Sequence, residues 1–222
     1  SNSFFSLIAR TVENAARRQG YAIVLCDTGD DESIEQEALS LLLDRSVDGF
    51  LLSPVGKGSQ HIQSVYERGV PLVLVDRFFD NIDIPYVTSN NYQGAYDGTA
   101  HLIELGHQRI AFVQGIPDSK PNRERLRGYQ QALADRGLPL EAALIQGSTF
   151  SEDDGYQSAQ TLLRGDAMPT ALFASSSLGA LGVMRACLEM GLEIPHDLSL
   201  IGFDDYPYAP LLSPPLTTIA QP

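Results

Sequence analysis

The sequence predicts an α/β protein whose parallel sheets are covered by helices on both faces. A helical stretch, a glycine and a short apolar run recur at residues 19–25, 68–75 and 94–113. Glycine suits the end of each helix because it adopts positive φ without a Cβ penalty. Helices that alternate with short, continuously apolar strands are typical of a parallel sheet that is buried on both sides.

The first half of the chain alternates these elements from its start. Phe5, Ile8 and Val12 lie at helical spacing, and the polar residues 30–33 can cap a second helix. In chain order we expect a helix from residue 2 or 3, a strand at 21–25, a helix after 33, a strand at 48–53, a helix around 62–66, strands at 72–75 and 86–88, and a helix that ends at 105.

The second half continues the alternation. Helical spacing of apolar residues predicts helices around 126–133, 156–163 and 178–188, and apolar runs predict strands at 110–113, 143–146, 171–174 and 198–202. The paired prolines Pro214 and Pro215 exclude a helix near the end, so residues 213–219 are expected to be extended.

Gly106 marks the expected boundary between two lobes. A helix that ends at Leu105 leads through a short polar connection into the apolar run 110–113, with similar units on either side. We therefore expect an N-terminal lobe at residues 1–105 and a C-terminal lobe at residues 106–222. A doubly wound lobe usually opens on a strand at the centre of its sheet. This chain opens on a helix and stops at Pro222, so we expect a fragment that is clipped at both ends and lacks its first strand.

Composition disfavours several classes of protein. The formal net charge of −13 opposes nucleic-acid binding through the general surface. No apolar run approaches ~18 residues, and residues 1–5 lack a basic region and a cleavage site, so neither a membrane span nor a secretory signal is indicated. Cys26 and Cys187 are expected to be buried free thiols in a reducing compartment, which favours the cytoplasm.

Catalytic and metal-binding motifs fit the sequence poorly. Residues 56–59 lack the leading glycine of a phosphate-binding loop, and no G-x-S-x-G motif offers a serine nucleophile. The four histidines show no metal-ligand spacing with one another or with either cysteine. We therefore expect no catalytic residue, no metal and no cofactor.

Polar and aromatic residues gather instead where strands end and helices begin, which is the edge at which open α/β sheets bind ligands. Each of them could singly be a helix cap or a solvated polar group, and Phe4 and Phe150 could be core aromatics. The other members are Asn2, Ser53, Asp76, Arg77, Ser89, Asn90, Arg125, residues 175–177 and Asp204.

Several motifs follow one another in a fixed order. They are Val47-Asp48-Gly49-Phe50, Val70-Pro71 through Asp76-Arg77, Asn90 with Gly94, His101-Leu102, Gly106-His107-Gln108-Arg109-Ile110, Arg125-Leu126-Arg127-Gly128-Tyr129, Pro169-Thr170-Ala171-Leu172-Phe173, Ile201-Gly202-Phe203-Asp204-Asp205, and Pro215-Leu216-Thr217-Thr218-Ile219 with Gln221-Pro222. Any one motif is weak, but the ordered set over the whole chain is specific. Together the motifs resemble the ligand-binding core of the LacI/GalR (lactose-repressor) family of bacterial transcription regulators.

The resemblance implies a periplasmic-binding-protein-like fold of two doubly wound parallel-sheet lobes joined by three crossovers. A small effector, sugar-like or nucleoside-like, would lie in the cleft between the lobes. The resemblance also implies a cytoplasmic homodimer that represses transcription by binding operator DNA through an N-terminal headpiece absent from this sequence. It implies no contact with a membrane.

Residue by residue, the resemblance also implies an effector site. Arg125 and Asp204 match the most characteristic effector-binding positions of the family, where a guanidinium can donate twice to ligand oxygens and a carboxylate accepts from hydroxyl or N–H groups. Ser176 and Ser177 replace an Asn-Asp pair that is common in the family, which removes a strong acceptor. The other implied contacts are Phe150 and Phe79 as aromatic walls, and Asn2, Phe4 and Ser53 on the first-lobe side.

Two other functions stay open for this fold. A secreted solute-binding protein of a sugar transporter would share the architecture but would be monomeric. An α/β enzyme would need a nucleophile–base pair or a phosphate loop, and neither is recognisable in the sequence.

Overall fold

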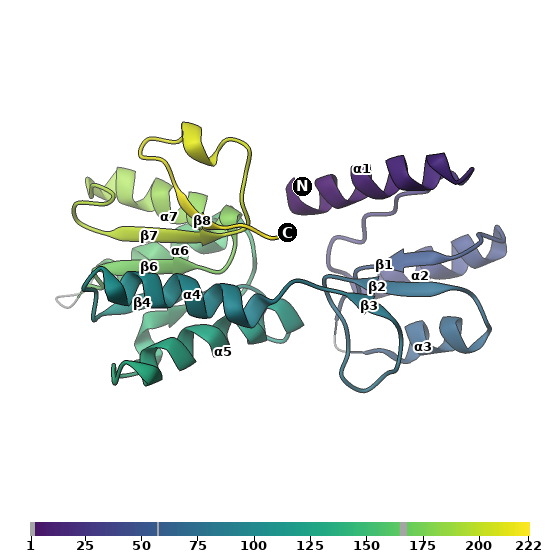
Figure 1. Ribbon diagram of the computed structural model, residues 1–222, viewed down its shortest axis with the longest axis horizontal. Coiled ribbons are helices and arrows are strands. Elements are labelled where there is room, and N and C mark those ends of the chain that lie inside the picture. The colour runs from purple at the N-terminus through teal and green to yellow at the C-terminus, as the bar shows by residue number, and fades with distance from the viewer. Residues whose placement is uncertain (1–2, 57, 165–167) are drawn as a thin grey trace. The chain divides into compact units, whose positions relative to one another are not determined.

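The computed structural model describes residues 3–56, 58–164 and 168–222, and the chain forms two compact units, Ser1–Thr88 and Ser89–Pro222 (Figure 1). Both units contain a parallel sheet with flanking helices, so the predicted fold class is confirmed.

The first unit is built on a three-stranded parallel sheet of order β1-β2-β3. Its elements are α1 (Ser3–Arg18), α2 (Glu32–Asp44), β1 (Phe50–Leu52), α3 (Gln60–Glu67), β2 (Leu72–Val75) and β3 (Tyr86–Val87). Leu52 pairs with Leu74, which in turn pairs with Tyr86. Apolar side chains of α2, α3 and β2, among them Leu39 and Ile62, form the core of this unit.

The expected strand at residues 21–25 is not formed. The segment has no strand partner among the described residues, and Leu25 is 75% exposed. β1 lies at the edge of this sheet, and its Leu51 is 55% exposed. In the second unit the first strand pairs on both sides, with the second and the third strand of that unit, whereas the first unit opens on α1. The run 21–25 thus stays outside the three-stranded sheet, although its composition is that of a strand. For the same reason Cys26 is exposed, so its expected burial is wrong.

The second unit is built on a five-stranded parallel sheet of order β5-β4-β6-β7-β8 (Figure 1). Its helices are α4 (Asn91–Glu104), α5 (Lys120–Asp135), α6 (Glu152–Leu162) and α7 (Ser177–Met190), with short 3-10 turns η1 (Ala142–Leu144) and η2 (Ala209–Leu211). Its strands are β4 (Ile110–Val113), β5 (Ile145–Gln146), β6 (Ala171–Ala174), β7 (Ser199–Phe203) and β8 (Thr217–Ile219). The expected strand at 143–146 thus begins as the η1 turn.

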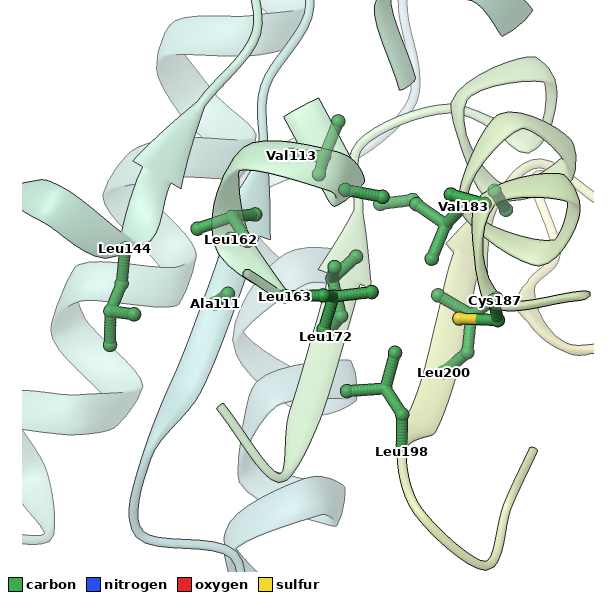
Figure 2. Close-up of a cluster of buried hydrophobic side chains, with 14 residues drawn as sticks. Ala111, Val113, Leu144, Leu162, Leu163, Leu172, Val183, Cys187, Leu198 and Leu200 are labelled. Carbon is green, nitrogen blue, oxygen red and sulfur yellow. The ribbon is translucent and has the colours of Figure 1, made fainter. Parts of the chain in front are cut away.

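Both faces of this second sheet are buried. Successive strand residues point to opposite faces, so Phe112 packs with α4 and α5 while Val113 packs with α6 and α7. Figure 2 shows the cluster on the second face, in which Cys187 lies among leucine side chains. This two-sided burial explains why the strands are continuously apolar.

Helix α4 packs within the second unit. Gly94 and Gly98 face the sheet, where a Cβ on Gly98 would lie 2.6 Å from the Phe173 ring. Gly128 of α5 lies against the α4 backbone, since a Cβ there would lie 2.3 Å from the Tyr92 carbonyl oxygen. The division by packing therefore falls before α4, at Thr88–Ser89, and differs from the boundary at Leu105–Gly106 expected from the sequence.

Across the described residues, the helices are too short or too polar to cross a membrane. In the same part of the chain, no three His, Cys, Asp or Glu side chains gather in a way that could hold a metal ion.

Candidate functional site

Four predicted site residues lie in the second unit at the carboxyl ends of its strands or the starts of the following helices. Arg125 lies in the second turn of α5, Phe150 precedes α6, Ser176 caps α7 and Asp204 follows β7. Arg125 contacts Phe150 directly. It also contacts Ser175, which precedes Ser176, and Phe203, which precedes Asp204.

Arg125 is the centre of this group. Its side chain is only 4% exposed. The Nε atom donates to Oδ1 of Asn91 at 2.8 Å, and Nη1 donates to the Ser175 carbonyl oxygen at 2.6 Å. The guanidinium carbon lies 3.7 Å from the centroid of the Phe203 ring and 5.9 Å from that of Phe150. Cation–π contact and charge-assisted hydrogen bonds together fix this guanidinium in one orientation.

Phe150 packs on the backbone of the loop after β4. An added Cβ on Gly115 would lie 1.9 Å from the Phe150 ring, so only glycine leaves room for the aromatic side chain here. The Gly115 N–H donates to Oδ1 of the fully buried Asn122 at 2.7 Å, which holds the loop against the start of α5. The half-buried ring therefore lies over an ordered stretch of backbone.

Asp204 adopts a backbone conformation that is rare for a residue with a side chain. Its φ is +75°, and its N–H donates to the Ile219 carbonyl oxygen at 3.0 Å. The carboxylate is buried and accepts a hydrogen bond from Nε2 of Gln221. Aspartate tolerates positive φ better than most residues, and such conformations cluster at functional sites.

Ser176 is already engaged as a helix cap. Its Oγ accepts from the Gly179 N–H at 3.0 Å and donates to the Phe150 carbonyl oxygen at 3.4 Å. The hydroxyl thereby links α7 to the segment that carries Phe150. Its expected contact with an effector stays a prediction.

The predicted residues of the first unit lie in three places. Phe4 lies in α1, with its ring edge-on to Phe5 at 5.2 Å between centroids. Ser53 follows β1, and its buried Oγ has no hydrogen-bond partner among the described residues. Phe79 packs partly buried against the core of the unit. Asn2 lies outside the described residues.

Asp76 occupies in the first unit the place that Asp204 occupies in the second. It follows β2, is buried, has a φ of +66° and donates its N–H to the Val87 carbonyl oxygen of β3 at 2.8 Å. The next residue, Arg77, forms an ion pair with Asp30. Asp76 belongs to the edge group recognised in the sequence, but its likeness to Asp204 became visible only from the backbone angles.

Comparison with known proteins decides the family. The family model for a periplasmic binding protein-like domain matches residues 99–222. The chain is 33% identical to catabolite control protein A of Priestia megaterium, over 100% of this chain and 67% of that protein. It is 33% identical to the HTH-type transcriptional repressor PurR of Haemophilus influenzae, over 98% of this chain and 65% of the repressor. The chain belongs to the LacI family of transcriptional regulators.

A solved LacI-family structure supports the assignment. The chain matches a LacI-family transcriptional regulator from Enterococcus faecium with bound ribose at a TM-score of 0.90 and 32% identity, covering 100% of this chain and 80% of that one. The chain spans about two thirds of the length of its curated relatives. Because the relatives are transcriptional regulators, the transporter alternative is not favoured.

Sequence reasoning missed several neighbours of this candidate site. Asn91, Asn122, Phe203 and Gln221 hold or flank the predicted residues. Tyr206 is also buried beside Asp204, and burial raises the pKa of its phenol to about 12. The sequence offered no clear signal for this group, since Asn122 lies in the polar first turn of α5, where its burial cannot be read from the residue type.

Proposed function

We propose that this chain is the effector-sensing core of a LacI-type transcriptional repressor. A small hydroxyl-bearing effector, sugar-like or nucleoside-like, binds at the carboxyl edge of the second sheet. The observation that carries the proposal is the buried Arg125 guanidinium, held against Phe203 and near Phe150, with Asp204 directly after Phe203.

The chemistry of the group suits a neutral polar ring. The guanidinium offers donors in a fixed plane, the Asp204 carboxylate accepts from hydroxyl groups, and Phe150 offers an aromatic face. One cation and one anion balance each other in this group, so the ligand needs no net charge. The ribose in the Enterococcus faecium regulator is a ligand of this chemical class.

Effector binding controls transcription in this proposal by shifting a conformational equilibrium. The shift is no larger than the difference in effector affinity between the two states. The proposed partners are a second copy of the chain and operator DNA, which is bound through a headpiece outside this chain. The similar PurR is named an HTH-type repressor. A cytoplasmic location and the absence of catalysis are parts of the same proposal, and the predicted lobes and cleft stay predictions.

Calorimetry with D-ribose and adenosine tests the proposal. Arg125→Ala and Asp204→Ala are expected to abolish binding, while Arg127→Ala retains it. Arg127 lies on the same helix with its side chain 63% exposed, and so it controls for loss of an arginine from α5. Circular dichroism checks that each variant is folded. Unchanged affinity in both site variants would contradict the site.

A further inference from the structure

Polar atoms without a partner gather around Asp204 in the second unit. In the described part of this unit, three of the four buried side-chain nitrogen or oxygen atoms that have no hydrogen-bond partner are Ser177 Oγ, Tyr206 OH and Gln221 Oε1. Gln221 donates to Asp204 through its other amide atom, and Tyr206 follows Asp204 by two residues. Because a buried hydroxyl without a partner destabilises the folded chain, native proteins keep few of them. Their concentration beside one carboxylate marks a place where a ligand can supply the missing partners.

Two of these atoms are the hydroxyls of Ser177 and Tyr206, which are neighbours. Ser177 is the first residue of α7 and is 0% exposed, and Tyr206, in the loop between β7 and β8, is 1% exposed. Burial raises the pKa of the Tyr206 phenol to about 12, so the phenol keeps its proton at neutral pH. The Ser177 hydroxyl lowers this pKa, which shows that it lies near the phenol oxygen, but neither oxygen has a partner with the geometry of a hydrogen bond.

A hydroxyl group is the ligand group that matches this pair. It can accept a hydrogen bond from the Tyr206 O–H and donate one to Ser177 Oγ, which gives both buried oxygens a partner. A carboxylate or a phosphate can only accept, and its charge would lie near the buried carboxylate of Asp204. The chemistry of the pair therefore favours an uncharged hydroxyl over an anionic group.

We propose that Tyr206 and Ser177 determine the specificity of the effector site by binding a second hydroxyl of the effector, next to the one that Asp204 binds. This narrows the effector to a compound with neighbouring hydroxyls, such as a sugar or the ribose part of a nucleoside. The proposal rests on the proposed function and concerns the second unit alone. It adds Tyr206, which is absent from the effector contacts predicted from the sequence.

The loop between β7 and β8 controls access to the pair. Both hydroxyl oxygens are covered in the described conformation. The Tyr206 ring stacks on the ring of Tyr208 at 4.7 Å between centroids, and Tyr208 is 41% exposed. This part of the loop thus lies at the surface, so the ligand hydroxyl reaches Tyr206 and Ser177 when the loop shifts, without a change in the sheet.

Calorimetry with D-ribose and with deoxy derivatives that each lack one of its hydroxyls tests the proposal. Tyr206→Phe removes only the phenol oxygen, and it is expected to weaken D-ribose binding by roughly tenfold. Its affinity for one deoxy derivative should equal that of the unmodified chain, because this derivative lacks the hydroxyl that Tyr206 binds. Ser177→Ala should spare the same derivative. Tyr208→Phe, which removes the neighbouring phenol oxygen, is the matched control and should leave every affinity unchanged. Adenosine and its deoxy derivatives give the same comparison for a nucleoside effector.

Urea unfolding without ligand separates recognition from a structural role. Tyr206→Phe should be at least as stable as the unmodified chain, since the phenol oxygen has no partner to lose. A clear loss of stability would mean that a buried water holds the hydroxyl, and it would overturn the proposal. An affinity loss that is equal for D-ribose and all its derivatives, or no loss at all, also overturns it but leaves the proposed function standing. If the unmodified chain binds neither D-ribose nor adenosine, the proposed function itself fails.

Discussion

Asp76 and Asp204 are equivalent residues of the two units. Each follows the second-to-last strand of its sheet, has positive φ and donates its N–H to a carbonyl of the last strand, at 2.8 Å from Asp76 and 3.0 Å from Asp204. The same turn thus places a buried carboxylate at the carboxyl edge of both sheets. An L-residue with positive φ costs conformational energy, and such a conformation persists only when the surroundings impose it.

Substitutions of Asp204 separate its backbone role from its carboxylate. Asp204→Gly and Asp204→Ala both remove the carboxylate, so both should lose effector binding by calorimetry. Glycine relieves the positive φ, whereas alanine does not, so the alanine variant should be less stable by about 1 kcal/mol in urea unfolding. Equal stability of the two variants would show that the turn stores no strain. Asp204→Asn, which tolerates this φ, controls for loss of charge alone.

Gly115→Ala should move the Phe150 ring. The added Cβ would lie 1.9 Å from an atom of that ring, and the ring can turn away more easily than backbone can shift. We therefore expect a stability loss of no more than about 2 kcal/mol but a clear loss of effector affinity. Phe150→Leu is the matched variant, since it removes the aromatic face without crowding the loop. A Gly115→Ala variant with unchanged affinity would exclude Phe150 as a wall of the site.

The elements of the second unit could be predicted from the sequence because its strands are buried on both faces, so apolar runs such as 110–113 and 171–174 coincide with β4 and β6. The run 21–25 is similarly apolar but pairs with no described strand, because composition does not reveal which apolar runs have a strand partner. The place of α4 depends on the close approach of Gly98 to Phe173, which is likewise a tertiary contact.

The candidate site was predictable in part. Arg125 and Asp204 could be placed at one sheet edge because strand ends and helix starts are readable from the sequence. Their partners could not be, because Asn91 and Arg125 are far apart in the chain and meet only through the packing of α4 on α5. The positive φ of Asp76 and Asp204 also leaves no mark in the sequence, because aspartate occurs in many conformations.

His107 should make the second unit less stable in acid. Its Nδ1 lies 2.9 Å from Thr170 Oγ1 and its Nε2 lies 3.0 Å from Ser199 Oγ, which joins the starts of three strands. Burial lowers the pKa of His107 in the folded chain. Between that lowered pKa and about 6.5, the unfolded chain therefore binds more protons than the folded chain. The contribution of His107 to the free energy of unfolding is thus complete above pH ~6.5 and declines as the pH falls. Urea unfolding of His107→Gln should lose that part of the pH dependence, and His196→Gln, at an exposed position, should retain it.

The two cysteines should differ sharply in reactivity. Cys26 is exposed, whereas Cys187 is 1% exposed and burial raises the pKa of its thiol to about 11. Because the thiolate is the reactive form, Cys187 should react only when α7 separates from the sheet. Labelling with iodoacetamide at neutral pH should modify Cys26 within minutes and Cys187 only in denaturant. A Cys26→Ser variant shows the labelling of Cys187 without that of Cys26. Rapid labelling of Cys187 in the folded Cys26→Ser chain would mean that the leucine cluster around it opens far more often than its burial indicates.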